Sequence, residues 1–122
     1  MNTTKKLVVS LMFVAASAVQ VAAWAHASLQ SATPAKDAEI TPAPKEVVMR
    51  FNEDLEPAFI SAKVLNDAGT VVSTEKAVLD ANDRKVMKIA LPALAPGKYT
   101  VQYTAVGHDG HRRGGEYSFT VK

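Results

Sequence analysis

The sequence predicts an all-β, Greek-key β-sandwich of about seven strands. Apolar residues alternate with other residues through several short segments, which is the period of a strand, and no segment of useful length has the helical period. Turn residues such as Asn66–Gly69 and Pro96-Gly97 separate these segments at regular intervals, as in two-sheet antiparallel sandwiches. Tyr99 follows the second of these turns, an arrangement typical of the tyrosine corner in Greek-key folds.

Each expected strand carries an apolar residue at every second position. In chain order, after an extended segment near Leu29, the strands are marked by Val47, Met49 and Phe51; by Ile60, Ala62 and Val64; by Thr70–Thr74 as an edge strand; by Met87, Ile89 and Leu91; by Tyr99, Val101, Tyr103 and Ala105; and by Tyr117, Phe119 and Val121. The sequence predicts a loop from Gly107 to Gly115 between the last two strands, where sandwich folds often carry their functional residues.

The first 25 residues have the features of a secretory signal peptide. Lys5-Lys6 precede an apolar run from Leu7 to about Ala23, and Ala23-Trp24-Ala25 fits the small-x-small cleavage rule. A membrane anchor is disfavoured, because polar residues interrupt the run and a cleavage site ends it. We therefore expect a signal peptide over 1–25 and one exported domain over 26–122, which begins at His26.

Charge and cysteine content exclude several classes of function. Lys5 and Lys6 are the only charged residues of the signal peptide, so its removal takes the formal net charge from +2 to zero. No basic stripe remains to favour nucleic acid or an anionic membrane, and a neutral surface suits a small ligand or a protein partner. The chain has no cysteine, which excludes thiolate metal sites and cysteine nucleophiles.

Cleavage before His26 would give this residue two nitrogen donors. Its α-amine, with a pKa near 8, and its imidazole, with a pKa near 6.5, both lose their protons readily at neutral pH. The amine and Nδ1 of one residue can close a chelate ring on a metal ion, and Cu(II) prefers square-planar nitrogen and oxygen ligands. The alternative is that cleavage at a histidine is coincidental.

Asp109 and His111 form a second candidate pair of metal ligands. Only Gly110 separates them, and residues at i and i+2 of an extended segment point the same way, so a carboxylate and an imidazole could converge on one ion. The alternative is an ordinary Asp-Gly hairpin turn, which leaves His111 without a role. His108 is next to Asp109 and should point away from the pair; the alternative is that it acts as a reserve ligand. No local pattern shows that His26 reaches this loop.

These residues together resemble the CopC-type copper resistance proteins. The resemblance covers nearly all of 26–122, and the N-terminal histidine occurs together with the Asp-Gly-His motif. The segments that carry it are His26-Ala27-Ser28-Leu29, Ser31-Ala32-Thr33-Pro34-Ala35, Arg50-Phe51-Asn52-Glu53-Asp54-Leu55-Glu56, Leu94 to Tyr103, and Asp109-Gly110-His111 with Gly114 and Phe119.

The resemblance implies an immunoglobulin-like β-sandwich in the bacterial periplasm that binds one Cu(II) per chain. It implies as ligands the amine and ring of His26, the carboxylate of Asp109 and the imidazole of His111. Glu53 would lie near the site and orient a ligand through a hydrogen bond, unless it is simply a solvated carboxylate at a strand end. The function implied is copper carriage, sequestration or resistance by a monomer that is not an enzyme, with a CopD-type inner-membrane copper transporter as a partner.

The sequence departs from the branch of the family that has a methionine-rich Cu(I) segment. Soft thioethers select Cu(I), but the mature chain has only Met49 and Met87, both in alternating strands, so we expect core packing and a Cu(II)-only protein. A histidine-brace copper monooxygenase is a second hypothesis. It would need an open coordination position, which Asp109 would fill. A metal-free adhesion module is a third, and it would leave His26 and His111 unexplained.

Overall fold

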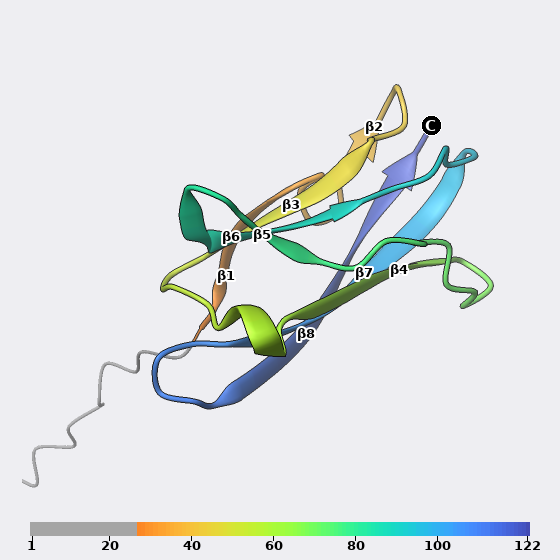
Figure 1. Ribbon diagram of the computed structural model, residues 1–122. Coiled ribbons are helices and arrows are strands. Elements are labelled where there is room, and N and C mark those ends of the chain that lie inside the picture. Colours follow the sequence, from red (N-terminus) through yellow and green to blue (C-terminus); the bar gives the residue numbers. More distant parts are fainter. Residues whose placement is uncertain (1–26) are drawn as a thin grey trace, which may run out of the picture.

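The computed structural model describes residues 27–122; the expected signal peptide and His26 lie outside this range. Eight strands form two sheets (Figure 1). The described elements are β1 (Leu29–Thr33), β2 (Glu39–Ile40), β3 (Glu46–Phe51), the short 3-10 helix η1 (Pro57–Phe59), β4 (Ser61–Asn66), β5 (Val78–Asp80), β6 (Asp83–Ala90), β7 (Gly97–Val106) and β8 (Arg112–Val121). Within 27–122, no helix is long and apolar enough to cross a membrane.

The two sheets have strand orders β1-β3-β6-β5 and β2-β8-β7-β4. The chain crosses from one sheet to the other after β1, β2, β3, β4 and β6, so strands that are adjacent in sequence mostly lie in different sheets. Neighbouring strands are antiparallel, except that the short β2 pairs with β8 in parallel. The expected all-β sandwich is confirmed.

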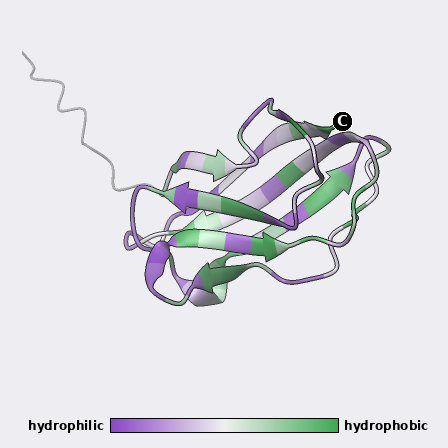
Figure 2. Ribbon diagram, turned by 90° about the horizontal axis from the view of Figure 1, so that it is seen from above, coloured by the Kyte–Doolittle hydropathy of each residue, from purple (hydrophilic) through white to green (hydrophobic). Residues whose placement is uncertain are grey.

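The alternating residues face inward and form one core between the sheets. The same alternation is visible as bands of opposite hydropathy along the strands (Figure 2). Met49 and Met87 lie opposite each other in the β3–β6 pair, and both are fully buried, which confirms that they are packing residues. Other buried members of this core include Val47, Phe51, Val64, Ile89, Val101, Ala105, Tyr117, Phe119 and Val121.

The tyrosine corner is present. The Tyr99 hydroxyl donates a hydrogen bond of 2.6 Å to the carbonyl oxygen of Ala95, four residues upstream. The Tyr99 ring also stacks on that of Phe119, with the ring centroids 5.7 Å apart. The hydroxyl thus ties the start of β7 to the turn before it, while the ring packs in the core.

The edge of the second sheet differs from expectation. Residues Thr70–Thr74 do not form a strand, because they make only one bridge to β4, between Val71 and Leu65. After the Ser73 hydroxyl accepts a bond from the Val64 amide, the chain leaves for the other sheet and becomes β5. The two strands that we did not expect, β2 and β5, are two and three residues long, too short for alternation to reveal them.

The loop between β7 and β8 is also shorter than expected. The two strands pair without a break, from Gly97 opposite Val121 to Val106 opposite Arg112. Strand β8 therefore starts at Arg112, and only residues 107–111 connect the two strands. Gly114 and Gly115 belong to the strand. A side chain at Gly115 would overlap the hydroxyl of Tyr103, which lies over this position. The connection that carries Asp109 and His111 is therefore a tight five-residue loop fixed at both ends.

Candidate metal centre

Asp109 and His111 are held in a hydrogen-bonded turn at one end of the sandwich (Figure 1). The Gly110 amide donates to the Gly107 carbonyl oxygen at 3.1 Å, and Gly110 has a φ of 73°, which favours glycine. The His111 amide donates to Asp109 Oδ1 at 3.0 Å. The Asp-Gly turn is thus present, and it also fixes the backbone positions of Asp109 and His111.

The carboxylate of Asp109 and the imidazole of His111 lie close together. His111 Nδ1 is 3.5 Å from Asp109 Oδ2. The Asp109 side chain is 26% exposed and the His111 side chain 69% exposed, so an ion could reach both from solvent. A nitrogen and an oxygen donor at this separation suit a divalent transition metal.

The start of β1 is anchored at this same end. Ala27 is buried, and the Ser28 amide donates to Asn52 Oδ1 at 2.7 Å. The Asn52 amide donates in turn to the Ser28 carbonyl oxygen at 3.1 Å. The first described residues are therefore fixed beside the end of β3.

The segment that leaves β3 connects this anchor to the 107–111 loop. The Glu56 amide donates to the carbonyl oxygen of Val106 at 2.8 Å. The Glu53 side chain lies directly against Gly107, because a methyl group at Gly107 would overlap Glu53 Oε1 and lie only 2.5 Å from its Cδ. Residues 52–56 thus lie between the beginning of β1 and the loop that carries Asp109 and His111.

One oxygen of Glu53 has no partner within the described part of the chain. Oε1 is buried there without a hydrogen bond. Buried polar atoms nearly always have a partner, so a group other than the described residues, such as a water, an ion or another donor, is needed to satisfy it. The alternative of a freely solvated carboxylate does not fit this oxygen.

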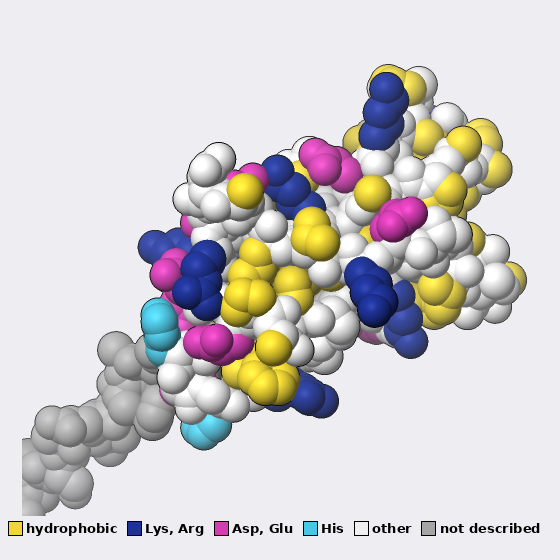
Figure 3. Space-filling view, in the orientation of Figure 1, with side chains coloured by type: hydrophobic (Ala, Val, Ile, Leu, Met, Phe, Trp, Pro, Cys, Tyr) yellow, Lys and Arg dark blue, Asp and Glu magenta, His cyan; other side chains and the backbone are white. Residues whose placement is uncertain are grey.

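The described residues supply only part of a metal site. Among residues 27–122, no group of three or more His, Asp and Glu side chains could hold an ion. Figure 3 shows the histidine side chains at the end of the molecule where the described chain begins, with acidic side chains close by. His108 lines a groove of about 390 Å³ on the same loop, together with Gly107, Gly110 and residues of the neighbouring segments.

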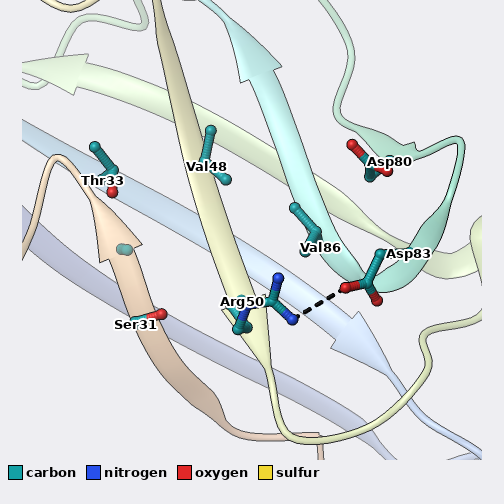
Figure 4. A pocket seen from close by; sticks show the side chains of 8 residues that line it. Ser31, Thr33, Val48, Arg50, Asp80, Asp83 and Val86 are labelled. Carbon is teal, nitrogen blue, oxygen red and sulfur yellow. Dashed lines mark hydrogen bonds and ion pairs between the residues drawn. The ribbon is translucent and has the colours of Figure 1, made fainter.

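A pocket on the outer face of the other sheet has different chemistry (Figure 4). Its carboxylates already have cationic partners: Asp83 Oδ2 is 3.0 Å from an Arg50 nitrogen, and Asp80 Oδ2 is 2.7 Å from Lys88 Nζ. The hydrogen bond from Lys88 lowers the pKa of Asp80, and the backbone amide of Lys85, followed by Arg50, lowers that of Asp83. The pocket contains no histidine, so it lacks the imidazole donor that the 107–111 loop offers.

Sequence reasoning did not assign roles to Asn52 and Gly107. A short polar side chain directly after a strand often bonds to nearby backbone, which is the one signal that Asn52 offered. A glycine at the end of a strand can mark a close approach by another group, and Gly107 does so here. The group that approaches each of them comes from a segment far away in the sequence.

Comparisons with known proteins agree with this fold. The CopC domain family matches residues 29–122. Protein YobA of Escherichia coli (strain K12) is 34% identical over 122 residues, which cover 99% of this chain and 98% of YobA. Copper resistance protein C of Pseudomonas syringae pv. tomato is 35% identical over 118 residues, 91% of this chain and 92% of that protein. The crystal structure of CopC from Methylosinus trichosporium OB3b superposes with a TM-score of 0.75 at 34% identity, covering 80% of this chain and 94% of that one.

Proposed function

Because this chain belongs to the CopC family of copper resistance proteins, we propose that it binds one Cu(II) in the bacterial periplasm and carries or sequesters it. The proposed ligands are the α-amine and Nδ1 of His26, a carboxylate oxygen of Asp109 and the imidazole of His111. The observation that carries the proposal is the convergence, at one end of the sandwich, of the start of the described chain and the Asp109–His111 turn.

Covalent geometry supports the role of His26. One peptide bond joins it to Ala27, so their Cα atoms are about 3.8 Å apart. Ala27 is buried, and Ser28 is hydrogen-bonded to Asn52, which immediately precedes the carboxylate that packs on Gly107. Cleavage before residue 26 would therefore place two nitrogen donors on a segment whose next residues are fixed near the loop.

Glu53 has a supporting role in this proposal. Its buried Oε1 lacks a partner among residues 27–122 and is next to the 107–111 loop. A deprotonated carboxylate there can accept a hydrogen bond from the amine or from an imidazole N–H of a ligand. Such a bond orients the ligand and raises its basicity.

The donor set favours Cu(II) over Cu(I). It contains nitrogen and oxygen donors only, whereas Cu(I) is selected by thiolates and thioethers. Met49 and Met87, the only methionines after residue 26, are fully buried in the core. Competition with a Cu(I) chelator should strip Cu(I) from the protein completely, and retention of tightly bound Cu(I) would contradict the assignment.

We propose that the protein is not an enzyme. Two donors from His26 and one each from Asp109 and His111 would fill the square plane of Cu(II), whereas an oxygen-activating copper site keeps a position open. The copper would be delivered by a monomer to a CopD-type transporter in the inner membrane, or retained.

The test is a titration of correctly processed protein with Cu(II), paired with protein that carries one extra glycine before His26. The extra residue converts the amine to an amide and breaks the chelate, so affinity should fall by at least the roughly 10–100-fold that loss of an outer-shell partner costs. His111→Ala and Asp109→Ala should also weaken binding, with His108→Ala as the matched control that does not.

Electron paramagnetic resonance should show one tetragonal Cu(II) with several nitrogen ligands. Thermal melting without metal should be nearly the same for native and extended protein, since an extra glycine before His26 changes none of the core side chains, the first of which is Ala27. Equal affinity in the two proteins would show that the N-terminal donors are not used. Two bound Cu(II) ions per chain would contradict the proposal of a single site.

A further inference from the structure

The Asn52 side chain bonds to backbone near the beginning of the described segment. Its Oδ1 accepts a 2.7 Å hydrogen bond from the Ser28 amide, two residues after the proposed terminal ligand. The β1–β3 pairing begins at Leu29, opposite Phe51, and its register shifts between Leu29 and Ser31. The Asn52 side chain therefore reinforces the backbone next to the irregular end of this pairing, together with the bond from the Asn52 amide to the Ser28 carbonyl oxygen.

We propose that Asn52 is a positioning residue that holds the N-terminal segment in place for Cu(II), an inference that rests on the function proposed above. Asn52 acts through Ser28, whose amide it binds, and so fixes the backbone that leads to the proposed terminal ligand.

The physical reason is conformational entropy. A ligand on a chain end loses backbone freedom when it binds an ion, and each residue that is already ordered before binding removes part of that loss. The side-chain bond to Ser28 adds to the backbone bond from the Asn52 amide to the Ser28 carbonyl oxygen, so Ser28 is held at both its amide and its carbonyl group. Without the side-chain bond, the Ser28 peptide would be less ordered before the metal binds, and affinity would fall.

The local geometry makes Asn52→Ala a mild change for the fold. The backbone bond from the Asn52 amide to the Ser28 carbonyl oxygen and the β1–β3 ladder remain. The matched control is Asn66→Ala. Asn66 Oδ1 also accepts backbone amide bonds, from Ala68 at 3.1 Å and Thr70 at 2.9 Å, in a turn that joins β4 to the segment after it.

The experiment measures two properties of native protein, Asn52→Ala, Asn52→Asp, Asn52→Gln and Asn66→Ala, each cleaved before residue 26. Hydrogen exchange of the metal-free proteins should show that the Ser28 amide loses protection in Asn52→Ala and Asn52→Gln, and keeps its native protection in Asn66→Ala. Cu(II) affinity should fall about 10–100-fold in Asn52→Ala, as for other outer-shell partners, and stay native in Asn66→Ala.

The conservative variants separate positioning from general damage. Asn52→Asp keeps an oxygen acceptor at the same place and should bind Cu(II) close to the native level. Asn52→Gln keeps the amide but moves the acceptor by one methylene, and it should lose affinity like Asn52→Ala. If Asn52→Ala proves too unstable to titrate, the comparison of the Asp and Gln variants decides the question.

Coupling to the N-terminus provides the sharpest criterion. If Asn52 acts through the terminal ligands, Asn52→Ala should cause no further loss in the protein that carries an extra glycine before His26, because non-additivity marks residues that work as a unit. Full additivity, or native affinity in Asn52→Ala, would overturn the positioning role while leaving the copper function intact. Absence of Cu(II) binding by native protein would overturn both.

Discussion

Gly107→Ala tests whether the Glu53 carboxylate matters to the copper site. The added methyl would overlap Glu53 Oε1 and lie 2.5 Å from Cδ and 3.1 Å from Cγ. Carbon atoms pack best at about 3.5–4.0 Å, so the carboxyl carbon must move by about 1 Å or more. Gly107 is not one of the glycines with positive φ, so the backbone itself accepts alanine.

The expected effect on stability is small. Forcing Glu53 from its rotamer costs about 1 kcal/mol. Replacing glycine by alanine at a permissive backbone position returns a similar amount, about 0.4–1 kcal/mol, by restricting the unfolded chain. Cu(II) affinity should nevertheless fall about 10–100-fold, or roughly 1.4–2.8 kcal/mol, because the displaced carboxylate no longer orients its ligand.

Gly69→Ala is the matched control with the opposite pattern. Gly69 has a φ of 80° in an exposed turn, and a methyl group added there would meet no atom within 4 Å. Alanine should cost about 1 kcal/mol of stability from backbone strain without changing Cu(II) affinity.

The assays are urea unfolding of the metal-free proteins and competition titration with Cu(II). Glu53→Ala is added to form a double-mutant cycle. If the methyl acts through Glu53, Gly107→Ala should cause no further loss of affinity in the Glu53→Ala background. Native affinity in Gly107→Ala, or an equal loss in both backgrounds, would refute the reasoning.

Three further predictions concern protons and hydroxyls. Cu(II) affinity should fall from pH 8 to pH 5, as protons compete first for the amine and then for the imidazoles, and an affinity that is flat in titrations across this range would contradict the ligand set. Tyr99→Phe should lower the free energy of unfolding, measured in urea, by about 1 kcal/mol, because it removes the hydrogen bond to Ala95. Tyr117→Phe should leave this free energy unchanged or raise it, because the buried Tyr117 hydroxyl has no partner within residues 27–122. The pKa of Asp83 is lowered on folding by the bond from the Lys85 backbone amide and then by Arg50, so its contribution to stability is present above pH 3.8 and is lost as pH falls through the folded pKa. Asp83→Asn should therefore destabilise the protein more at pH 7 than in acid, and an effect that does not change with pH would exclude the ionised carboxylate as the cause.

The core and the fold class could be predicted from the sequence because burial repeats locally along a strand. Val47, Met49 and Phe51 alternate within one segment, and so do Tyr99, Val101 and Ala105; all six are buried as expected. The tyrosine corner is also a local pattern, since Tyr99 bonds to a residue only four positions away. Short elements such as β2 and β5 carried too few residues to show a period.

Within the candidate site, the closeness of Asp109 and His111 could be inferred from the sequence, because only Gly110 separates them. The contacts of Ser28 with Asn52 and of Glu53 with Gly107 emerged only in the folded chain. These contacts join segments 24 and 54 positions apart, and their geometry depends on how the two sheets stack. No local period encodes that stacking, so the framework that surrounds the proposed copper site could not be read from the order of the residues.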